Sequence, residues 1–219
     1  MAGIARYGSY VPHFRFQRSA LGSGRGERAV ASYDEDSVSM AVEAAREALR
    51  DGASPDALIF ATTSPPYAEK LNAATLQAAL SLPATLRSIE LGGAPRMGFG
   101  ALLLGLDLAT AGQRSLVAVA DVVIGGPGGA RESQGGDAAA TFTTAPDDEA
   151  CAVCVGRASA TTELLDAWRL PEERFVSQWE ERFGADVLAP VLVDTVTRAL
   201  HQAGVEPTDL ATVIVDATN

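Results

Sequence analysis

The chain has 219 residues, of which 47% are hydrophobic and 21% are charged, so it can bury a core and is not expected to be disordered. Its 17 Lys and Arg residues against 28 Asp and Glu residues give a formal net charge of −11, which disfavours binding to nucleic acid. The longest apolar segment, residues 101–106, contains Gly105 and falls far short of the ~20 residues needed to span a membrane.

Three further features of the sequence indicate the compartment of the protein and the kinds of partner it can have. The sequence does not open on a basic segment followed by an apolar one, so we expect a cytoplasmic protein without a membrane partner. The most basic stretch, residues 15–28, is interrupted by glycines and by Glu27, so we expect no nucleic-acid partner. The two cysteines, Cys151 and Cys154, are too few to stabilise a domain of this size through disulfides, which is consistent with a reducing compartment.

Predicted strands and helices alternate over the first half of the chain. Apolar runs predict strands at residues 3–11, 57–62, 87–91 and 115–124, and helical spacing of small and apolar residues predicts helices at 38–50, 72–82 and 95–111. Residues 34–37 supply N-cap groups for the first helix, and Pro95 suits the first position of the third. This order favours an α/β fold with a largely parallel sheet covered by helices on both faces.

The composition changes after residue 124. A Gly-rich connection covers residues 125–140, and strands are predicted at 138–144 and 150–155 around an acidic turn at 146–149. Residues 161–184 are more charged and carry Trp168 and Trp179, which we expect to be packing residues. A helix over 186–203, closed by Gly204, and a final apolar strand over 211–217 indicate the start of a second α/β unit.

Motifs typical of cofactor or metal chemistry are weak. The Gly-rich segment at residues 22–27 lacks the complete pattern of a phosphate-binding or dinucleotide-binding loop. Cys151 and Cys154 have no second ligand pair, and on a strand their thiols would face opposite sides, so we interpret them as buried apolar residues. His13 could line a site but is expected at the surface, and His201 is expected to interact with the C-terminal end of its helix. We expect no metal site.

The most informative segment is the strand-to-helix turn at residues 89–100, Ile-Glu-Leu-Gly-Gly-Ala-Pro-Arg-Met-Gly-Phe-Gly. A cysteine at such a turn is activated because the positive end of the helix dipole lowers the pKa of its thiol. Here Pro95 and Arg96 occupy the tip of the turn, and neither side chain can act as a nucleophile.

Eight segments, taken in chain order, resemble the N-terminal half of 3-hydroxy-3-methylglutaryl-CoA synthase, within the thiolase superfamily. They are GIARYGSYVP, DEDSVSMAVEAAREAL, IFATTSPPYAEKLNAATLQAAL, IELGGAPRMGFGAL, LVAVADV, GGDAAA, LLDAWRLP and the segment around Trp179. The resemblance extends to bacterial synthase-like proteins associated with zinc-ribbon/OB-fold modules. It implies a thiolase-like fold of two βαβαβ-based halves, with the first half at residues 1–160, a connecting segment at 161–185 and the start of the second half at 186–219.

The same resemblance implies chemistry on coenzyme A thioesters, without a further cofactor. The family uses a glutamate as acid and base, a cysteine that takes the acyl group, and a histidine that orients the second acyl-CoA. Matched segment by segment, these positions fall on Thr63, Pro95 and Asp216. Ser64 and Arg96 adjoin the first two and are candidates for substrate binding. Because all three catalytic positions are replaced, we expect no condensing activity from the chain alone; Asp216 could serve as a base or be an ordinary solvated residue.

Two functions remain open at this stage. The chain could be an acyltransferase-type protein that handles acyl-CoA, or a non-catalytic partner or scaffold of an active thiolase-like or OB-fold complex. The resemblance implies that the strand at 115–121 pairs with its mate across a dimer twofold, so we expect a homodimer or a complex with another thiolase-like or OB-fold chain. Because the sequence reaches only the first strand of a second half, we expect a fragment, a broken gene product or one part of a split protein.

Overall fold

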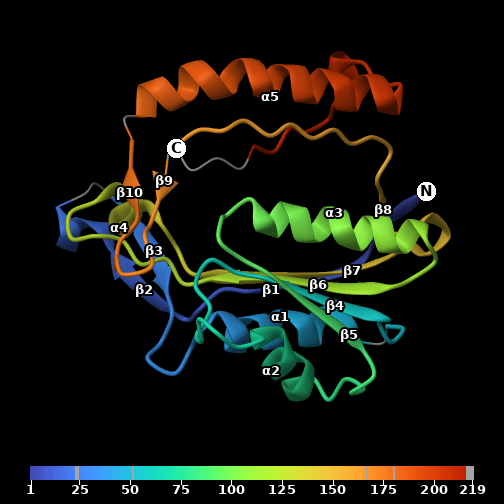
Figure 1. Cartoon of the computed structure of the whole chain (residues 1–219), viewed down its shortest axis with the longest axis horizontal. Coiled ribbons are helices and arrows are strands. Elements are labelled where there is room, and N and C mark those ends of the chain that lie inside the picture. The colour runs from blue at the N-terminus through green and yellow to red at the C-terminus, as the bar shows by residue number, and fades with distance from the viewer. Residues whose placement is uncertain (23–24, 51, 166, 180, 216–219) are drawn as a thin grey trace. The chain divides into compact units, whose positions relative to one another are not determined.

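A computed structural model describes residues 1–22, 25–50, 52–165, 167–179 and 181–215 of the chain, excluding the side chains of residues 181–183. The chain forms two compact units, Met1–Val153 and Cys154–Asn219. Figure 1 shows the helices and strands of both units. Each unit is described by itself below.

The first unit is built on a six-stranded mixed sheet. The strand order is β5 (Arg87–Leu91), β4 (Ala57–Ala61), β6 (Ser115–Asp121), β7 (Ala138–Pro146), β1 (Ala2–Tyr10) and β8 (Ala152–Val153). Strand β4 pairs in parallel with β5 and β6, whereas the pairings β6–β7, β7–β1 and β1–β8 are antiparallel. The expectation of a largely parallel sheet is therefore wrong for three of its five strand pairings, because β7 runs back beside β6 after the Gly-rich connection.

Helices cover both faces of this sheet, as the alternating pattern predicted. Helices α1 (Ser37–Leu49) and α2 (Asn72–Ala79) lie on one face, and α3 (Met97–Thr110) lies on the other (Figure 1). The predicted N-cap chemistry of α1 is present, since the Asp36 side chain accepts a hydrogen bond from the Ser39 backbone and Ser39 accepts one in return. Alanines on the buried side of α1 let the helix approach the sheet closely.

The contact between α3 and the sheet depends on small residues. A Cβ added at Gly105 would lie 2.6 Å from Val117 Cγ2, and the Gly105 carbonyl accepts a 2.9 Å hydrogen bond from Thr144 Oγ1. Although α3 consists largely of apolar and small residues, Phe99 is 58% exposed. Only the side that carries Ala101 and Gly105 is fully buried.

Sheet topology also corrects the expected dimer contact. Strand β6 lies between β4 and β7, so both of its edges are hydrogen-bonded within the unit. The resemblance had led us to expect that this strand pairs with its mate across a dimer twofold. Strand β6 has no free edge with which to form that pairing. Strand β5 is an edge strand of this sheet.

Short elements that the sequence did not predict complete the first unit. They are β2 (Phe14–Gln17), the 3-10 helix η1 (Arg18–Leu21), β3 (Glu27–Val30), α4 (Ala130–Gln134) and the 3-10 helix η2 (Asp147–Glu149). Strands β2 and β3 form a two-stranded antiparallel hairpin. Phe14 and Phe16 alternate with polar residues in β2, the pattern of a half-buried strand, but every residue of β2 is exposed.

The second unit contains strands β9 (Ala167–Trp168) and β10 (Ser177–Gln178), helix α5 (Glu181–Ala203) and the 3-10 helix η3 (Pro207–Asp209). Helix α5 begins five residues before the predicted start and ends at the predicted residue. The predicted packing role is wrong for Trp179, which is 52% exposed.

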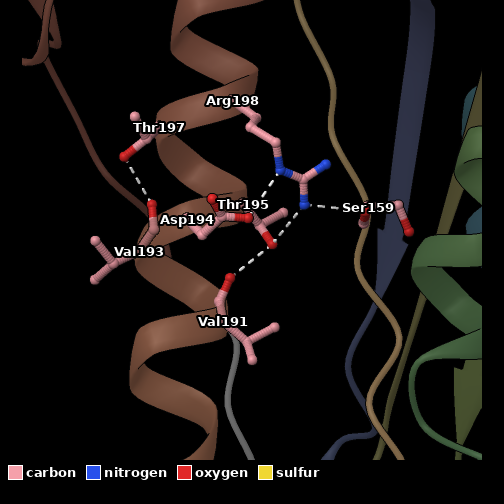
Figure 2. Close-up of polar contacts among 7 residues, drawn as sticks. All are labelled: Ser159, Val191, Val193, Asp194, Thr195, Thr197 and Arg198. Carbon is pink, nitrogen blue, oxygen red and sulfur yellow. Dashed lines mark hydrogen bonds and ion pairs between the residues drawn. The ribbon is translucent and has the colours of Figure 1, made fainter.

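Polar contacts tie α5 to the segment that precedes it within this unit (Figure 2). Arg198 Nε donates to Asp194 Oδ2 at 2.9 Å, and Arg198 Nη2 donates to the Ser159 carbonyl at 3.2 Å. The Thr195 hydroxyl bonds back to the Val191 carbonyl one turn earlier, at 2.7 Å.

The final predicted strand is absent over residues 211–215, the part of it that the structure describes. Its side chains are exposed, with Ile214 at 89%, and no strand of the described residues pairs with it. An apolar run forms a stable strand only with a neighbour to pair with. Among the described residues, no helix is long and apolar enough to cross a membrane.

Candidate functional site

The candidate site lies at one edge of the six-stranded sheet, where the parallel strands β4, β5 and β6 end. We call this the carboxyl edge. In the parallel register Ala61 pairs with both Leu91 and Val119, so the segments that follow the three strands leave the sheet side by side. These segments are residues 62–64 after β4, residues 92–96 after β5 and residues 122–137 after β6. Open α/β sheets bind their ligands at this edge.

Asp121, the last residue of β6, holds the segment after β4. One carboxylate oxygen, Oδ1, accepts hydrogen bonds from Thr62 Oγ1 at 3.0 Å, Thr63 N at 2.6 Å, Thr63 Oγ1 at 3.0 Å and Ser64 Oγ at 3.2 Å. The Ser64 hydroxyl oxygen in turn accepts a 2.8 Å bond from Val122 N. Thr63 and Ser64 are therefore fixed by a carboxylate on the neighbouring strand, and the Thr63 hydroxyl is already engaged within the protein.

The turn after β5 lies beside this loop. Thr62 N donates to the Leu91 carbonyl at 3.2 Å, and a Cβ at Gly92 would lie 3.3 Å from the Thr62 carbonyl oxygen. Gly93 has φ of +90°, a conformation that favours glycine. Pro95 and Arg96 follow, and both are exposed.

The turn then leads into α3. The Pro95 carbonyl accepts a 3.1 Å hydrogen bond from Gly98 N, which places Pro95 in the turn that starts the helix. No side chain from residue 92 to residue 100 is a thiol, hydroxyl or carboxylate. The turn has the geometry that activates a nucleophile but carries none.

Arginines gather beside the segment after β6. Arg28, on β3, donates to the Glu132 carbonyl at 2.6 Å and to the Val123 carbonyl at 3.5 Å. The Nε atom of Arg131, on α4, is buried and has no hydrogen-bond partner in the described part of the chain. Element η1, which carries Arg18, contacts α4. These guanidinium groups place positive charge at the carboxyl edge of an otherwise acidic protein.

Asp137 fixes the path of this arginine-bearing segment. Its side chain is 2% exposed and accepts hydrogen bonds from Val123 N at 2.8 Å and from Ala31 N at 2.7 Å. Both carboxylate oxygens are therefore used to join the β6–β7 connection to the end of the hairpin. Asp137 has a structural role at the edge of the site.

The positions singled out from the sequence are only partly brought together. Thr63 and Ser64 lie beside the turn that carries Pro95 and Arg96, whereas Asp216 lies outside the described residues. Sequence reasoning missed Asp121, although an aspartate that ends an apolar strand is a recognisable signal for the carboxyl edge.

The cysteines differ from their interpretation as buried apolar residues. Cys151 is exposed and its thiol donates to the Ile4 carbonyl at 3.2 Å, while Cys154 is half-buried. Cys151 precedes and Cys154 follows β8 in the chain, a short exposed strand at the edge of the sheet. Within the described ranges, no group of three or more His, Cys, Asp or Glu side chains could hold a metal ion.

The amino-acid sequence is similar to those of hydroxymethylglutaryl-CoA synthases from archaea. The chain is 28% identical over 221 residues to the hydroxymethylglutaryl-CoA synthase of Pyrococcus furiosus, covering 94% of this chain and 63% of the relative. It is 29% identical over 226 residues to the enzyme of the same name from Aeropyrum pernix, covering 95% and 63%. No family model matches the chain. The chain thus spans just under two thirds of the length of these relatives.

Solved structures give the fold. A structure described as HMG-CoA synthase complexed with CoA superposes with a TM-score of 0.83 at 20% identity, covering 96% of this chain and 58% of that one. The 3-oxoacyl-(acyl carrier protein) synthase III of Pseudomonas aeruginosa superposes with a TM-score of 0.80 at 21% identity, covering 95% and 73%. The chain is an HMG-CoA synthase-like protein with the thiolase-like fold. The resemblance and fold class predicted from the sequence are therefore confirmed.

Proposed function

We propose that this HMG-CoA synthase-like protein binds a coenzyme A thioester at the carboxyl edge without transferring the acyl group to itself. The observation that carries the proposal is the turn at residues 92–96. It lies beside Thr63 and leads into α3, but Pro95 occupies the position that matches the family's cysteine. A proline has no group that can form a thioester, so the two-step covalent route is closed at this position.

The neighbouring loop offers no replacement for the missing acid and base. Thr63 stands at the position that matches the family's glutamate, and its hydroxyl donates to Asp121. A hydroxyl with the pKa of an alcohol does not exchange protons near neutral pH as a carboxyl group does. Together, Thr63 and Pro95 favour binding over condensation.

Positive charge supports binding of the phosphates. Coenzyme A carries several phosphate groups, and guanidinium groups are well suited to bind phosphate because they offer paired donors. Arg28 and Arg131 lie on adjoining segments at the carboxyl edge, and the buried Nε of Arg131 is an unsatisfied donor in the described part of the chain. A buried unsatisfied donor is costly, and a bound phosphate would remove that cost. Relatives by fold include structures with CoA and with 3-hydroxy-3-methylglutaryl coenzyme A.

A second candidate function is that of a non-catalytic partner subunit in a thiolase-like or OB-fold complex. Exposed apolar side chains favour it, including Leu192, Val193 and Ile214 in the second unit. Soluble proteins rarely expose neighbouring large apolar residues unless they meet another surface. This function is compatible with thioester binding and differs only in requiring another chain.

Titration calorimetry with acetyl-CoA tests the binding proposal. We expect wild-type protein to bind acetyl-CoA, and the Arg131→Ala variant to bind it at least fivefold more weakly. Acetyl-pantetheine, which lacks the nucleotide and its phosphates, should bind both proteins equally. Arg50→Ala is the matched control, because Arg50 is exposed at the end of α1, at the opposite edge of the sheet. Absence of acetyl-CoA binding to the wild type would contradict the proposal.

A further inference from the structure

A cavity lies at the edge of the sheet opposite the candidate site, where β4 and β6 begin. It encloses about 250 Å³, and we call it the amino-edge cavity. Its walls come from β1, β7, η2, the segment after α1 and the residues that start β6, and they include Arg6, Gly52, Pro55, Arg114, Thr143 and Glu149. Because drug-sized ligands occupy roughly 300–1,000 Å³, this cavity has room only for a small molecule.

A β-bulge in β1 brings Arg6 to this cavity. Strand β1 pairs with β7 through Ile4 and Thr144 and next through Arg6 and Thr143, so Ala5 is the extra residue of the bulge. In a regular ladder Ala5 would lie opposite Thr143, and Arg6 would point to the other face of the sheet. Directly paired residues of antiparallel strands have their side chains on the same face. The bulge therefore places the Arg6 side chain beside the Thr143 hydroxyl.

Two polar groups in this wall are not used within the protein. Thr143 Oγ1 is buried and has no hydrogen-bond partner in the described part of the chain. Among the described residues, none forms a hydrogen bond or ion pair with the Arg6 side chain. A Cβ at Gly52 would lie 3.3 Å from Arg6 Cδ, so the aliphatic part of Arg6 lies against the segment after α1. A buried hydroxyl without a partner costs free energy, and a ligand that accepts its hydrogen bond removes that cost.

The charges around the cavity limit what can bind there. Arg114 Nε donates to Glu149 Oε2 at 3.2 Å and Arg114 Nη2 donates to the other carboxylate oxygen, so these two charges balance each other. The carboxylates of Asp56 and Asp148 also act on the Arg114 guanidinium. A single negative charge can pair with Arg6, whereas a multiply charged group such as phosphate would be repelled by the nearby carboxylates.

We propose that the amino-edge cavity is a binding site for a short-chain carboxylate. The carboxylate accepts paired hydrogen bonds from the Arg6 guanidinium, whose geometry matches it, and a further one from the Thr143 hydroxyl. The apolar chain of the ligand packs against Ala53, Pro55 and Ala145, which also line the cavity. This site and the proposed thioester site lie at opposite edges of the sheet, so neither proposal depends on the other.

Saturation-transfer NMR titrations with butyrate test the site. We expect the wild-type protein to bind butyrate with millimolar affinity. Butyramide, which has the same chain without the charge, should bind about tenfold more weakly or not at all. Arg6→Gln should weaken butyrate binding about tenfold or more, because it removes hydrogen bonds to a charged group. The matched control is Arg87→Gln, which removes the same charge from an exposed residue at the start of β5, outside the described walls of the cavity, and should bind butyrate within about twofold of the wild type.

Thr143→Val tests the hydroxyl in a side chain of similar shape. It should weaken butyrate binding about threefold but leave Tm unchanged or higher, because the hydroxyl has no partner to lose within the described part of the chain. Absence of butyrate binding to the wild type, or wild-type binding by either Arg6→Gln or Thr143→Val, would overturn the proposal. Tighter binding of inorganic phosphate than of butyrate would also overturn it.

Two measurements separate this site from the carboxyl edge. Acetyl-CoA should not displace butyrate, and the Arg131→Ala variant should bind butyrate as the wild type does. Displacement by acetyl-CoA would place the carboxylate at the carboxyl edge and overturn the proposal. Absence of acetyl-CoA binding with butyrate binding intact would instead refute the proposed function alone.

Discussion

The Asp121 carboxylate is the group whose removal should most directly loosen the candidate site. In Asp121→Asn the side chain keeps its shape but loses its charge, while four donors from residues 62–64 still point at one oxygen. A hydrogen bond to a charged group contributes about 1.5–3 kcal/mol and a neutral one about 0.5–1.5 kcal/mol, a difference of roughly 1 kcal/mol per bond. Because the four bonds share one partly exposed oxygen, we expect a total loss of about 2 kcal/mol.

Thermal unfolding followed by circular dichroism measures this loss. For a chain of this size, about 2 kcal/mol corresponds to a fall in Tm of roughly 4–8 °C. The control is Asp148→Asn, which removes the same charge from an exposed residue in η2. Hydrogen exchange should localise the effect to residues 62–64 and 122–123. If Asp121→Asn melts within about 1 °C of the Asp148→Asn control, the carboxylate does not hold the loop and the reasoning is refuted.

Two further predictions concern packing and pH. Gly105→Ala should destabilise the protein by about 1–3 kcal/mol in urea unfolding, because its Cβ would meet Val117 at 2.6 Å. Gly100→Ala, on the same helix with nothing within 4 Å, should instead be neutral or stabilising by about 0.5–1 kcal/mol; equal effects would refute the close-packing argument. The hydrogen bond from the Tyr10 hydroxyl to Glu35 raises the pKa of Tyr10 above 10.0. This bond should stabilise the protein fully below pH 10.0 and less as the pH rises through the raised pKa. Tyr10→Phe should therefore flatten the alkaline fall in stability, and an unchanged pH profile would contradict the assignment.

Most of the first unit could be predicted from its sequence because local pattern and burial agree there. The apolar run at residues 57–61 forms a fully buried strand, and β5 has the predicted bounds. The acidic and serine residues before α1 provide the cap, as their type predicts. Such elements are specified by residues close together in the chain.

The features that were missed depend on partners distant in the chain. The antiparallel direction of β7 is set by the path of residues 122–137, which Asp137 fixes through bonds to residues 31 and 123. The role of Asp121 depends on hydroxyl groups 57–59 residues away. Conversely, residues 211–215 have the composition of a strand but have no pairing strand among the described residues. Sequence pattern records propensity, whereas these outcomes depend on neighbours in space.

The residues alone singled out the turn at residues 89–100, but only the family resemblance assigned residues 63 and 95 to a common site. No spacing of reactive residues pointed to residues 63 and 95, because the residues found there are a threonine and a proline. The structure places them on adjoining loops at the carboxyl edge. Asp216, the third position, is outside the described residues, so its role in the site stays a prediction.

Intact-protein mass spectrometry after incubation with acetyl-CoA tests the central claim most directly. We expect no acetyl adduct on the wild-type chain with either acetyl-CoA or acetoacetyl-CoA. The Pro95→Cys variant places a thiol at the start of α3, where the helix dipole favours the thiolate, and should gain one acetyl group that hydroxylamine removes. Peptide mapping should place it at residue 95 rather than at Cys151 or Cys154. A stable acetyl adduct on the wild-type chain within residues 92–100 would contradict the account.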